Sequence, residues 1–224
     1  MTALDFLRRP PNLGGMTGFQ KRLLTASLAA CAAWTAPALA QDVARAPAGP
    51  AETVPEAPPE TTPASRAERL DALFVELAEP GRDDAPRIES DIKRLWSQSG
   101  SPAMDLLLRR SQEALAAGNT AAALDHVNAA IDHDPDFAEA WNLRAAIFFQ
   151  MNEYALATND IEHALALEPR HFDAMEGLAM IFQETDRPEL ALRALRAARA
   201  VNPNRESLKE AEERLERELG ASSL

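Results

Sequence analysis

Four histidines and a single cysteine limit the chemistry that this chain can support. His126 and His133 lie seven residues apart, and carboxylates beside them are supplied by Asp125, Asp132 and Asp134. Imidazole and carboxylate groups at this spacing are the ligand types of a zinc site. The apolar periodicity of the segment, however, places these side chains on the outward surface of a helix, where polar residues are ordinarily solvated. We therefore predict no metal site.

No arrangement typical of catalysis can be placed elsewhere in the sequence. His163 and His171 have no companions at ligand spacing and are interpreted as a surface residue and a turn residue. No Ser–His–Asp order, buried carboxylate pair or glycine-rich phosphate loop is found. The sequence predicts a protein that is not an enzyme and has no cofactor. A less favoured alternative is that the protein is an accessory subunit of an enzyme.

Composition narrows the class of partner. The chain has 224 residues, of which 46% are apolar and 26% charged, and its formal net charge is −12. The apolar fraction is sufficient for a folded core. A nucleic-acid partner is not expected, because a phosphate backbone attracts clustered lysine and arginine rather than an acidic surface.

Residues 1–40 have the order of features of a secretory signal peptide. A basic pair precedes an apolar run over residues 23–34, and Ala38 and Ala40 supply the small residues that signal peptidase requires. We predict cleavage after Ala40, with Met16 as a possible start of translation. The apolar run is too short to remain as a membrane anchor, so no transmembrane span is expected in the mature chain.

A second processing signal overlaps the first. The sequence that ends at Cys31 resembles a bacterial lipobox, in which this cysteine becomes a lipidated N-terminus. The residues that follow Cys31 are more apolar than is usual for lipoproteins, which favours cleavage after Ala40. The predicted location is therefore the periplasm, and the alternative is a protein anchored by lipid through Cys31.

A linker follows the signal. Residues 41–64 contain six prolines among alanine, glutamate and threonine, without apolar periodicity, and we expect them to be extended and disordered. Residues 1–40 hold four of the 23 basic and one of the 35 acidic side chains, so the remaining chain has a net charge of −15. This charge favours basic partners.

Helical patterns begin at Ser65, which forms a capping box with Glu68. Apolar residues at helical spacing continue to Pro80 and resume after Pro86, so residues 65–101 are predicted to form a hairpin of two helices. No segment alternates apolar and polar residues as a strand would. The predicted fold class is all-α.

A period of 34 residues is the strongest regularity in the chain. It defines units over residues 102–137, 138–171 and 172–205, followed by an amphipathic helix and tail over 206–224. Small residues at fixed positions allow helices to pack closely, and a recurring proline ends each second helix. The positions that recur are Ala123, Ala157 and Ala191, then Ala130, Ala164 and Ala198, then Pro135, Pro169 and Pro203.

The period and its residues resemble the tetratricopeptide repeat. The middle unit matches that family at Trp141, Ala145, Phe148, Ala157, Ile161, Ala164 and Pro169. The resemblance implies a right-handed α-solenoid of antiparallel helix pairs, like those of small exported proteins of Gram-negative bacteria. It makes residues 65–101 a degenerate N-terminal repeat that caps one end, and residues 206–224 a C-terminal cap with a solvated outer surface.

The resemblance also implies a concave groove lined by the first helix of each unit. Carboxylates at one edge and exposed apolar side chains within it predict a peptide or protein segment with apolar anchors and basic flanks. The groove residues are Leu108, Gln112, Glu139, Asn142, Phe149, Asp173, Glu176, Met180 and Gln183.

One ligand of this family is not expected. Its chaperone-binding members hold a terminal carboxylate with lysine and asparagine, and the corresponding positions here are Leu108, Gln112, Leu143, Asp173 and Gly177. We thus predict a non-catalytic interaction scaffold of the bacterial cell envelope. The alternative is a self-assembling structural lipoprotein anchored through Cys31, in which the open ends or the hairpin pair with a second copy.

Overall fold

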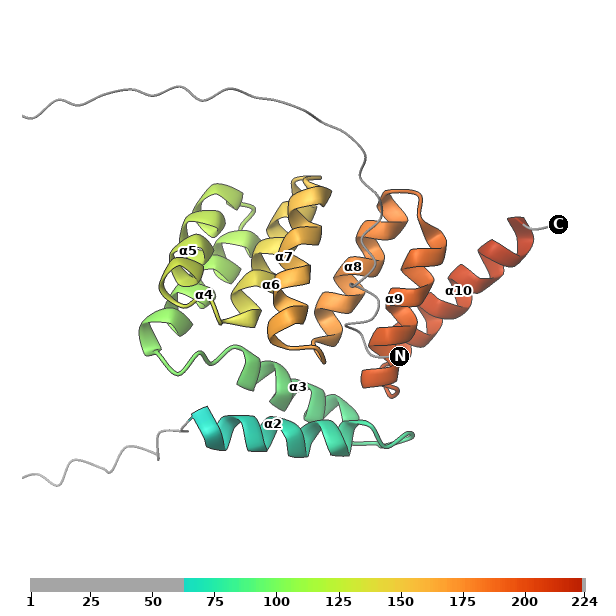
Figure 1. The fold of residues 1–224 in the computed structure, drawn as a ribbon, viewed down its shortest axis with the longest axis horizontal. Helices are drawn as coiled ribbons and strands as arrows, with labels where there is room; N and C mark the ends of the chain where they lie inside the picture. The colour runs from blue at the N-terminus through green and yellow to red at the C-terminus, as the bar shows by residue number, and fades with distance from the viewer. Residues whose placement is uncertain (1–62, 223–224) are drawn as a thin grey trace, which may run out of the picture. The chain divides into compact units, whose positions relative to one another are not determined.

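The computed structural model describes residues 63–222, and this part of the chain contains helices and no strands (Figure 1). The all-α prediction is confirmed for it. The helices are α2 (Pro63–Leu77), α3 (Ala85–Trp96), α4 (Pro102–Ala116), α5 (Thr120–His133), α6 (Ala138–Gln150), α7 (Tyr154–Leu167), α8 (Phe172–Glu184), α9 (Pro188–Val201) and α10 (Glu206–Ser222).

Three helix pairs, α4–α5, α6–α7 and α8–α9, are closed by the same kind of turn. Gly118, Asn152 and Asp186 occupy equivalent positions after the first helix of each pair, with φ of 74°, 60° and 55°. Glycine, asparagine and aspartate are the residues that tolerate this left-handed conformation. Two backbone hydrogen bonds of the Schellman type end each first helix, as in the bond of Glu153 N–H to the Phe148 carbonyl at 2.9 Å.

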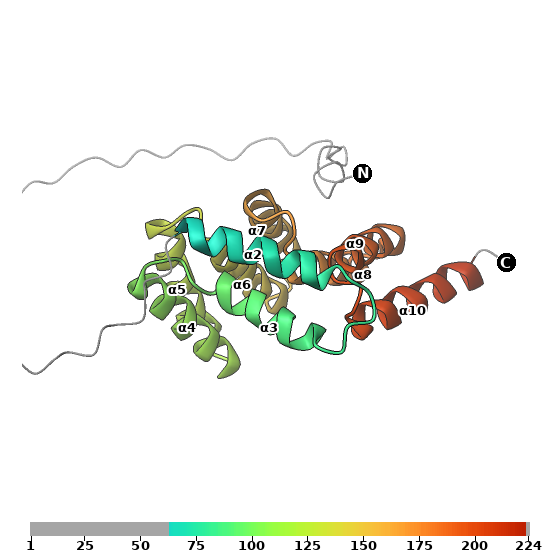
Figure 2. The same cartoon turned by 90° about the horizontal axis from the view of Figure 1, so that it is seen from below.

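The recurring alanines lie between the helices. Ala123, Ala157 and Ala191 are fully buried, and so are Ala130, Ala164 and Ala198. A methyl group at these positions lets neighbouring helix backbones approach, and larger residues such as Ile161 and Leu195 fill the remaining volume. Consecutive pairs stack side by side, α5 against α6 and α7 against α8, which is the solenoid arrangement expected from the sequence (Figures 1 and 2).

The last helix, α10, packs against α9. Leu208 and Leu215 are buried on the side that faces the stack. Glu212, which is also buried, lies between Arg196 and Arg199 of α9, with N–O distances of 3.1 and 2.7 Å. The remaining surface of α10 is rich in exposed glutamate and arginine, so this end of the stack presents a solvated surface.

The hairpin of α2 and α3 crosses the ends of the stacked helices (Figures 1 and 2). Trp96 of α3 stacks on His171 and contacts Phe172, where α8 begins. The side chain of Asn204, in the turn between α9 and α10, donates a hydrogen bond to the carbonyl of Leu77 at the end of α2 (2.8 Å). The hairpin is therefore a lateral brace that contacts both the turn between α7 and α8 and the turn between α9 and α10.

This position differs from the predicted one, a degenerate repeat stacked as a cap on the first pair. At the α4 end of the solenoid no cap is needed, because the exposed side chains Arg109, Arg110 and Glu113 of α4 are readily hydrated. The apolar side chains of α3, among them Ile88 and Ile92, are buried in the same core as α2 and α8.

The boundary between linker and domain also differs. Helix α2 begins at Pro63, so two residues of the predicted linker 41–64 are helical, and Ser65 lies within the helix instead of capping it. Proline is tolerated in a first helical turn, where its missing N–H has no partner to lose. The predicted signal peptide, with Ala38, Ala40 and Cys31, and the rest of the linker lie outside the described residues.

Candidate functional site

The first helices of the three pairs form one continuous surface. Helix α4 contacts α6, and α6 contacts α8, more extensively than any second helix contacts the next second helix. Helices on the inside of a curved stack approach each other more closely than those on the outside, so α4, α6 and α8 lie on the inner side. We call the surface that they present the inner face.

The predicted groove residues are not equally accessible on the inner face. Gln112, Met180 and Gln183 are exposed, and the exposed fraction of Met180 is 46%. Asn142 and Phe149 are half-buried. This set combines amide groups with apolar side chains and carries no charge.

Leu108 does not belong to that set, and its predicted exposure is wrong. Its side chain is 1% exposed and lies in a core cluster with Val127, Leu143 and Ile147. This leucine packs with residues of α5 and α6, which removes its apolar side chain from water.

Phe149 is partly covered by its own chain. Its ring lies 5.6 Å from that of Tyr154, tilted by 56°, and it packs against the main core. The hydroxyl of Tyr154 donates to Asn152 Oδ1 at 2.9 Å, which holds the tyrosine in place across the turn. One edge of Phe149 remains accessible as a preformed apolar contact.

The carboxylate of Glu139 is engaged within the chain. His171 is fully buried, and its Nδ1 accepts the backbone N–H of Ala174, which makes it the N-cap of α8. Its Nε2 therefore carries the proton and donates to Glu139 Oε2 at 2.9 Å. The amide of Asn142 donates to the same oxygen at 3.3 Å. His171 lies in the turn before α8, as predicted. It is also fully buried and caps the first turn of that helix.

Asp173 and Glu176 are also engaged. Arg205 Nη1 lies 2.6 Å from Asp173 Oδ1 and 3.2 Å from Glu176 Oε2, and Lys93 Nζ lies 3.1 Å from Asp173 Oδ2. Burial raises the pKa of Glu176 above its ordinary value, and the charge of Arg205 offsets this only in part. Burial lowers the pKa of Lys93, but Asp173 and Glu89 outweigh that effect and raise it overall.

Asp105, the corresponding acid of the first unit, accepts the hydroxyl of Ser99 at 2.8 Å. The acidic edge expected from the sequence is therefore occupied by groups of the same chain. Lys93, which supplies one of its cations, lies outside the 34-residue units, so periodicity gave no signal for it. Arg205, which supplies the other, is the last residue of the third unit, at the position that His171 occupies in the second. Among the predicted groove residues, those that remain open are uncharged.

A second internal ion pair was also not foreseen from the sequence. Arg144 of α6 forms a bidentate pair with Asp160 of α7, with N–O distances of 2.7 and 2.8 Å, and Asp160 is 2% exposed. Arg144 Nη1 also donates to Asn128 Oδ1 at 2.9 Å, and the guanidinium of Arg144 lies over the ring of Trp141. Arginine here ties α6 to both flanking second helices.

The histidines of α5 lie apart from any such cluster. His126 is half-buried and His133 is exposed. Within residues 63–222, no group of three or more His, Cys, Asp or Glu side chains is arranged to hold a metal ion. No helix in this part of the chain combines the length and apolar composition needed to cross a bilayer.

Comparison with known proteins finds sequence relatives of this chain. A TPR repeat-containing protein of Rhizobium etli is 40% identical over 132 residues, which is 58% of this chain and 65% of that protein. This chain therefore covers slightly less than two thirds of its relative. No family model matches the sequence.

Solved structures agree on the fold. The TPR domain of Sgt2 from Aspergillus fumigatus superposes with a TM-score of 0.52 over 55% of this chain and 83% of that domain, at 20% identity. The first TPR of Spaghetti (RPAP3), bound to the HSP90 peptide SRMEEVD, gives 0.51 over 54% of this chain and 98% of that one, at 19% identity. The fold is that of a TPR solenoid, and the comparisons support the repeat family that the 34-residue period indicates.

Proposed function

We propose that this protein is a non-catalytic scaffold that holds a segment of another protein on its inner face. The observation that carries the proposal is the exposure of Met180, at 46%, on a surface otherwise lined by Gln112, Asn142, Phe149 and Gln183. Flexible methionine and a supported aromatic ring provide apolar anchors, and amides can pair with the backbone of a bound segment.

The chemistry of the inner face favours an uncharged, apolar segment. Glu139, Asp173 and Glu176 already have partners, so the basic flanks expected from the sequence would compete with Lys93, Arg205 and His171. The RPAP3 domain binds a peptide that ends in acidic residues. The open residues named above, Gln112, Asn142, Phe149, Met180 and Gln183, include no cation for such an end, which supports a different ligand.

The test is capture of partners by a photo-crosslinking amino acid at position 180 in living cells. Met180→Glu should abolish the capture of partners by cross-linkers at neighbouring inner-face positions, because a carboxylate would be placed in an apolar contact. Met151→Glu is the matched control, since Met151 is 42% exposed but lies in the turn after α6, and it should leave capture unchanged. Equal capture by both variants would exclude the inner face as the working surface.

We also propose that the protein acts in the periplasm after cleavage at Ala40. Support comes from the order of the basic pair, apolar run and small residues in residues 1–40. The intact mass of the mature protein decides this point. A chain that starts at Gln41 agrees with the proposal, whereas one that starts at a diacylglyceryl-modified Cys31 would establish the lipid-anchored alternative.

The self-assembling alternative predicts a different behaviour in solution. Light scattering coupled to size-exclusion chromatography would show a dimer or larger species whose mass is independent of dilution. A monomer across the accessible concentration range favours the scaffold, because the inner face is then free for a partner.

A further inference from the structure

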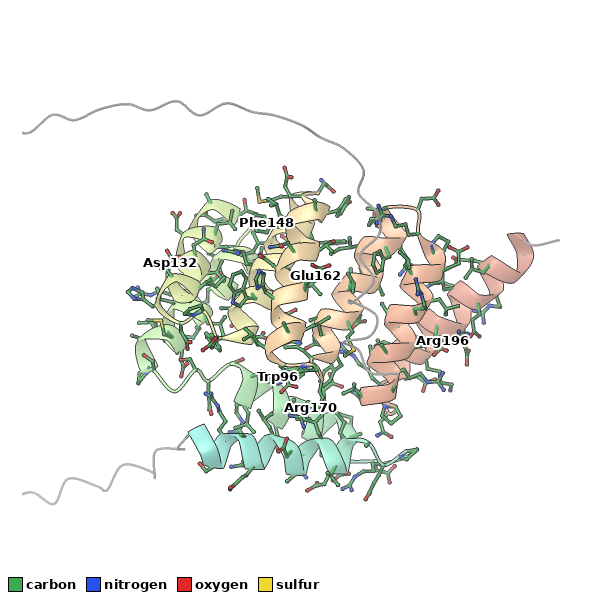
Figure 3. All side chains as sticks on the ribbon, in the orientation of Figure 1. Trp96, Asp132, Phe148, Glu162, Arg170 and Arg196 are labelled. Carbon is green, nitrogen blue, oxygen red and sulfur yellow. The ribbon has the colours of Figure 1, made fainter. Side chains whose placement is uncertain are left out.

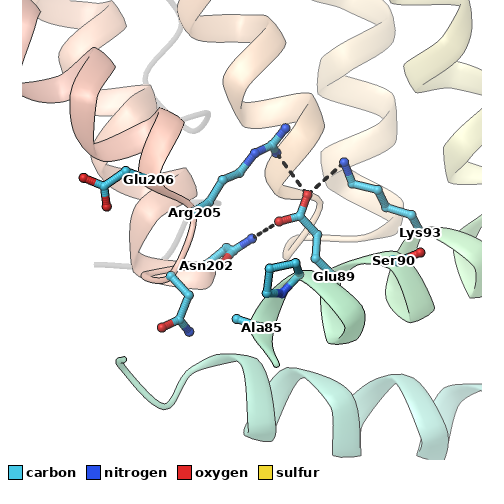
Figure 4. Close-up of a pocket in the computed structure, with 9 residues that line it drawn as sticks. Ala85, Glu89, Ser90, Lys93, Asn202, Arg205 and Glu206 are labelled. Atoms are coloured by element: carbon cyan, nitrogen blue, oxygen red, sulfur yellow. Dashed lines mark hydrogen bonds and ion pairs between the residues drawn. The ribbon is translucent and has the colours of Figure 1, made fainter. Parts of the chain in front are cut away.

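Two pockets lie at the C-terminal end of the solenoid. The larger, of about 480 Å³, lies between α3 and the turn that joins α9 to α10. Its polar side chains are engaged with one another, since Glu89 accepts Asn202 Nδ2 at 2.8 Å and lies 3.0 Å from Lys93 Nζ (Figure 4). The smaller, of about 270 Å³, lies between the turn that joins α8 to α9 and the second half of α10. We call the smaller one the α10 pocket.

The α10 pocket adjoins the inner face. Gln183 is one of the open residues of that face and also lines the pocket, and Met180 lies one helical turn before it on the same side of α8. The volume of 270 Å³ is below the roughly 300–1,000 Å³ of small-molecule sites, so the pocket suits a single side chain of a larger partner. The other lining residues are Asp186, Pro188, Leu215, Glu218 and Leu219.

Residues 34 positions earlier show which side chains the middle unit has at this place. The register puts Phe149 at the position of Gln183 and Tyr154 at the position of Pro188. In the middle unit the two rings are in contact, with centroids 5.6 Å apart, and both pack against the main core. The third unit has an amide and a proline instead of these two aromatic side chains, and the pocket lies where they are missing.

The backbones of the two turns match. Asn152 and Asp186 have φ of 60° and 55°, and the residue after each donates its backbone N–H to the preceding helix at 2.9 and 2.8 Å. Tyr154 and Pro188 are the first residues of α7 and α9. The two units therefore differ at this place in their side chains and not in the path of the chain.

An acceptor for a phenol hydroxyl is also present. In the middle unit the hydroxyl of Tyr154 donates to Asn152 Oδ1 at 2.9 Å. Asp186, at the equivalent position, supplies a carboxylate that makes no ion pair or side-chain hydrogen bond within residues 63–222. A carboxylate accepts a hydroxyl more strongly than an amide does. The acid Glu218 is compatible with a tyrosine here, because Glu184 holds the same position relative to Tyr154 in the middle unit.

We propose that the α10 pocket binds the side chain of a tyrosine in the partner segment, which rests on the proposed function for the source of that tyrosine. The ring packs against Pro188, Leu215 and Leu219, and its hydroxyl donates to the carboxylate of Asp186. Met180 and Gln183 lie on adjacent turns of α8, so one segment reaches both the apolar contact at Met180 and the pocket.

The first test is titration of the full mature chain with N-acetyl-tyrosinamide, followed by the NMR signals of the Leu215 and Leu219 methyl groups. Saturable shifts support the proposal, and their absence would overturn it. N-acetyl-phenylalaninamide should bind about fivefold more weakly, because it lacks the hydroxyl that pairs with Asp186. Tighter binding of N-acetyl-lysinamide than of the tyrosine amide would overturn the proposal in favour of a site for basic side chains.

One substitution fills the pocket from within the chain. Pro188→Tyr restores the ring that the middle unit has at Tyr154, so it should abolish binding of the tyrosine amide. Pro102→Tyr is the matched control, since Pro102 is exposed at the first position of α4, and it should leave binding unchanged. Equal binding by both variants would show that the tyrosine amide binds elsewhere.

Two substitutions of Asp186 test the hydrogen bond. Asp186→Gly keeps the left-handed backbone and removes the carboxylate, so tyrosine amide should bind no better than phenylalanine amide, whose affinity stays the same. Asp186→Asn should retain most of the tyrosine binding, because Asn152 accepts the same hydroxyl in the middle unit. An unchanged preference for tyrosine in Asp186→Gly would overturn the assigned contact.

Photo-crosslinking at position 180 separates this proposal from the scaffold function. Weaker capture of partners in Pro188→Tyr than in Pro102→Tyr supports a tyrosine on the partner. Equal capture in the two variants would overturn the tyrosine anchor and leave the scaffold function intact. Binding of tyrosine amide to the pocket without any capture at position 180 would contradict the scaffold function, whereas the preference of the pocket for tyrosine would stand.

Discussion

The indole ring of Trp96 lies flat on the imidazole of His171, with ring centroids 4.0 Å apart and planes inclined by 10°. This contact joins α3 to the residue that caps α8, and Figure 3 shows Trp96 at the junction of hairpin and solenoid, near Arg170. Arg170 makes a parallel link, since it lies 4.2 Å from the ring of Phe74 and 2.7 Å from Asp71. The brace thus fixes the turn between the second and third pairs.

Trp96→Ala should destabilise the protein by about 3–5 kcal/mol, because a buried aromatic side chain is lost from between Phe74, His171 and Phe172. Urea unfolding measures the loss, and hydrogen exchange should show it first in α2 and α3. Val75→Ala, at a position 70% exposed on α2, should change stability by less than about 0.5 kcal/mol. Unchanged protection of the hairpin would contradict its role as a brace.

Arg144→Met should cost about 3 kcal/mol, because it leaves Asp160 buried without its partner. The double variant with Asp160→Leu should recover most of this loss, since a buried pair replaced by apolar residues is often neutral. Arg109→Met breaks an exposed pair with Glu113 at 3.9 Å and should cost less than about 0.5 kcal/mol. A double-mutant cycle, measured by chemical denaturation, compares wild type, Arg144→Met, Asp160→Leu and the double variant. Losses of stability that simply add in the double variant would show that the pair is not coupled.

Gly118→Ala should destabilise the protein by about 1 kcal/mol through backbone conformation alone. Its φ is 74°, and an added Cβ would meet no atom within 4 Å, so no steric clash contributes. Asp186→Gly, at the equivalent position with φ of 55°, should raise stability by about 0.5 kcal/mol for the same reason. Gly220→Ala, in open space within α10, should not destabilise, and thermal unfolding compares the three variants.

Stability in acid should depend on Asp84. Hydrogen bonds from Arg82, at 2.8 and 3.0 Å, lower the pKa of this carboxyl from 3.8 to about 2. A carboxyl whose pKa is lower in the folded state stabilises the fold above its ordinary pKa and loses this contribution as the pH falls towards 2. The difference in melting temperature between wild type and Arg82→Gln should therefore be largest above pH 4 and shrink towards pH 2. A constant difference across this range would contradict the assignment.

The sequence by itself determined the repeat. Ala157 and Ala191 had to be small because helices pack at close range at the same place in every unit, and this demand recurs every 34 residues, so it is visible without coordinates. The turns are equally local, since Gly118, Asn152 and Asp186 each satisfy one backbone conformation. The inner-face positions of Met180 and Gln183 followed from the same register.

Only the tertiary structure decided where the hairpin lies and which charges remain free. The contacts that place it join residues far apart in the chain, such as Trp96 with His171, Arg170 with Asp71 and Asn204 with Leu77, and no period relates them. For the same reason the pairing of Asp173 with Lys93 was hidden, and an expected acidic edge became an internal network. Leu108 differed because its burial depends on how α4 packs against α5 and α6, which the spacing of residues alone does not determine.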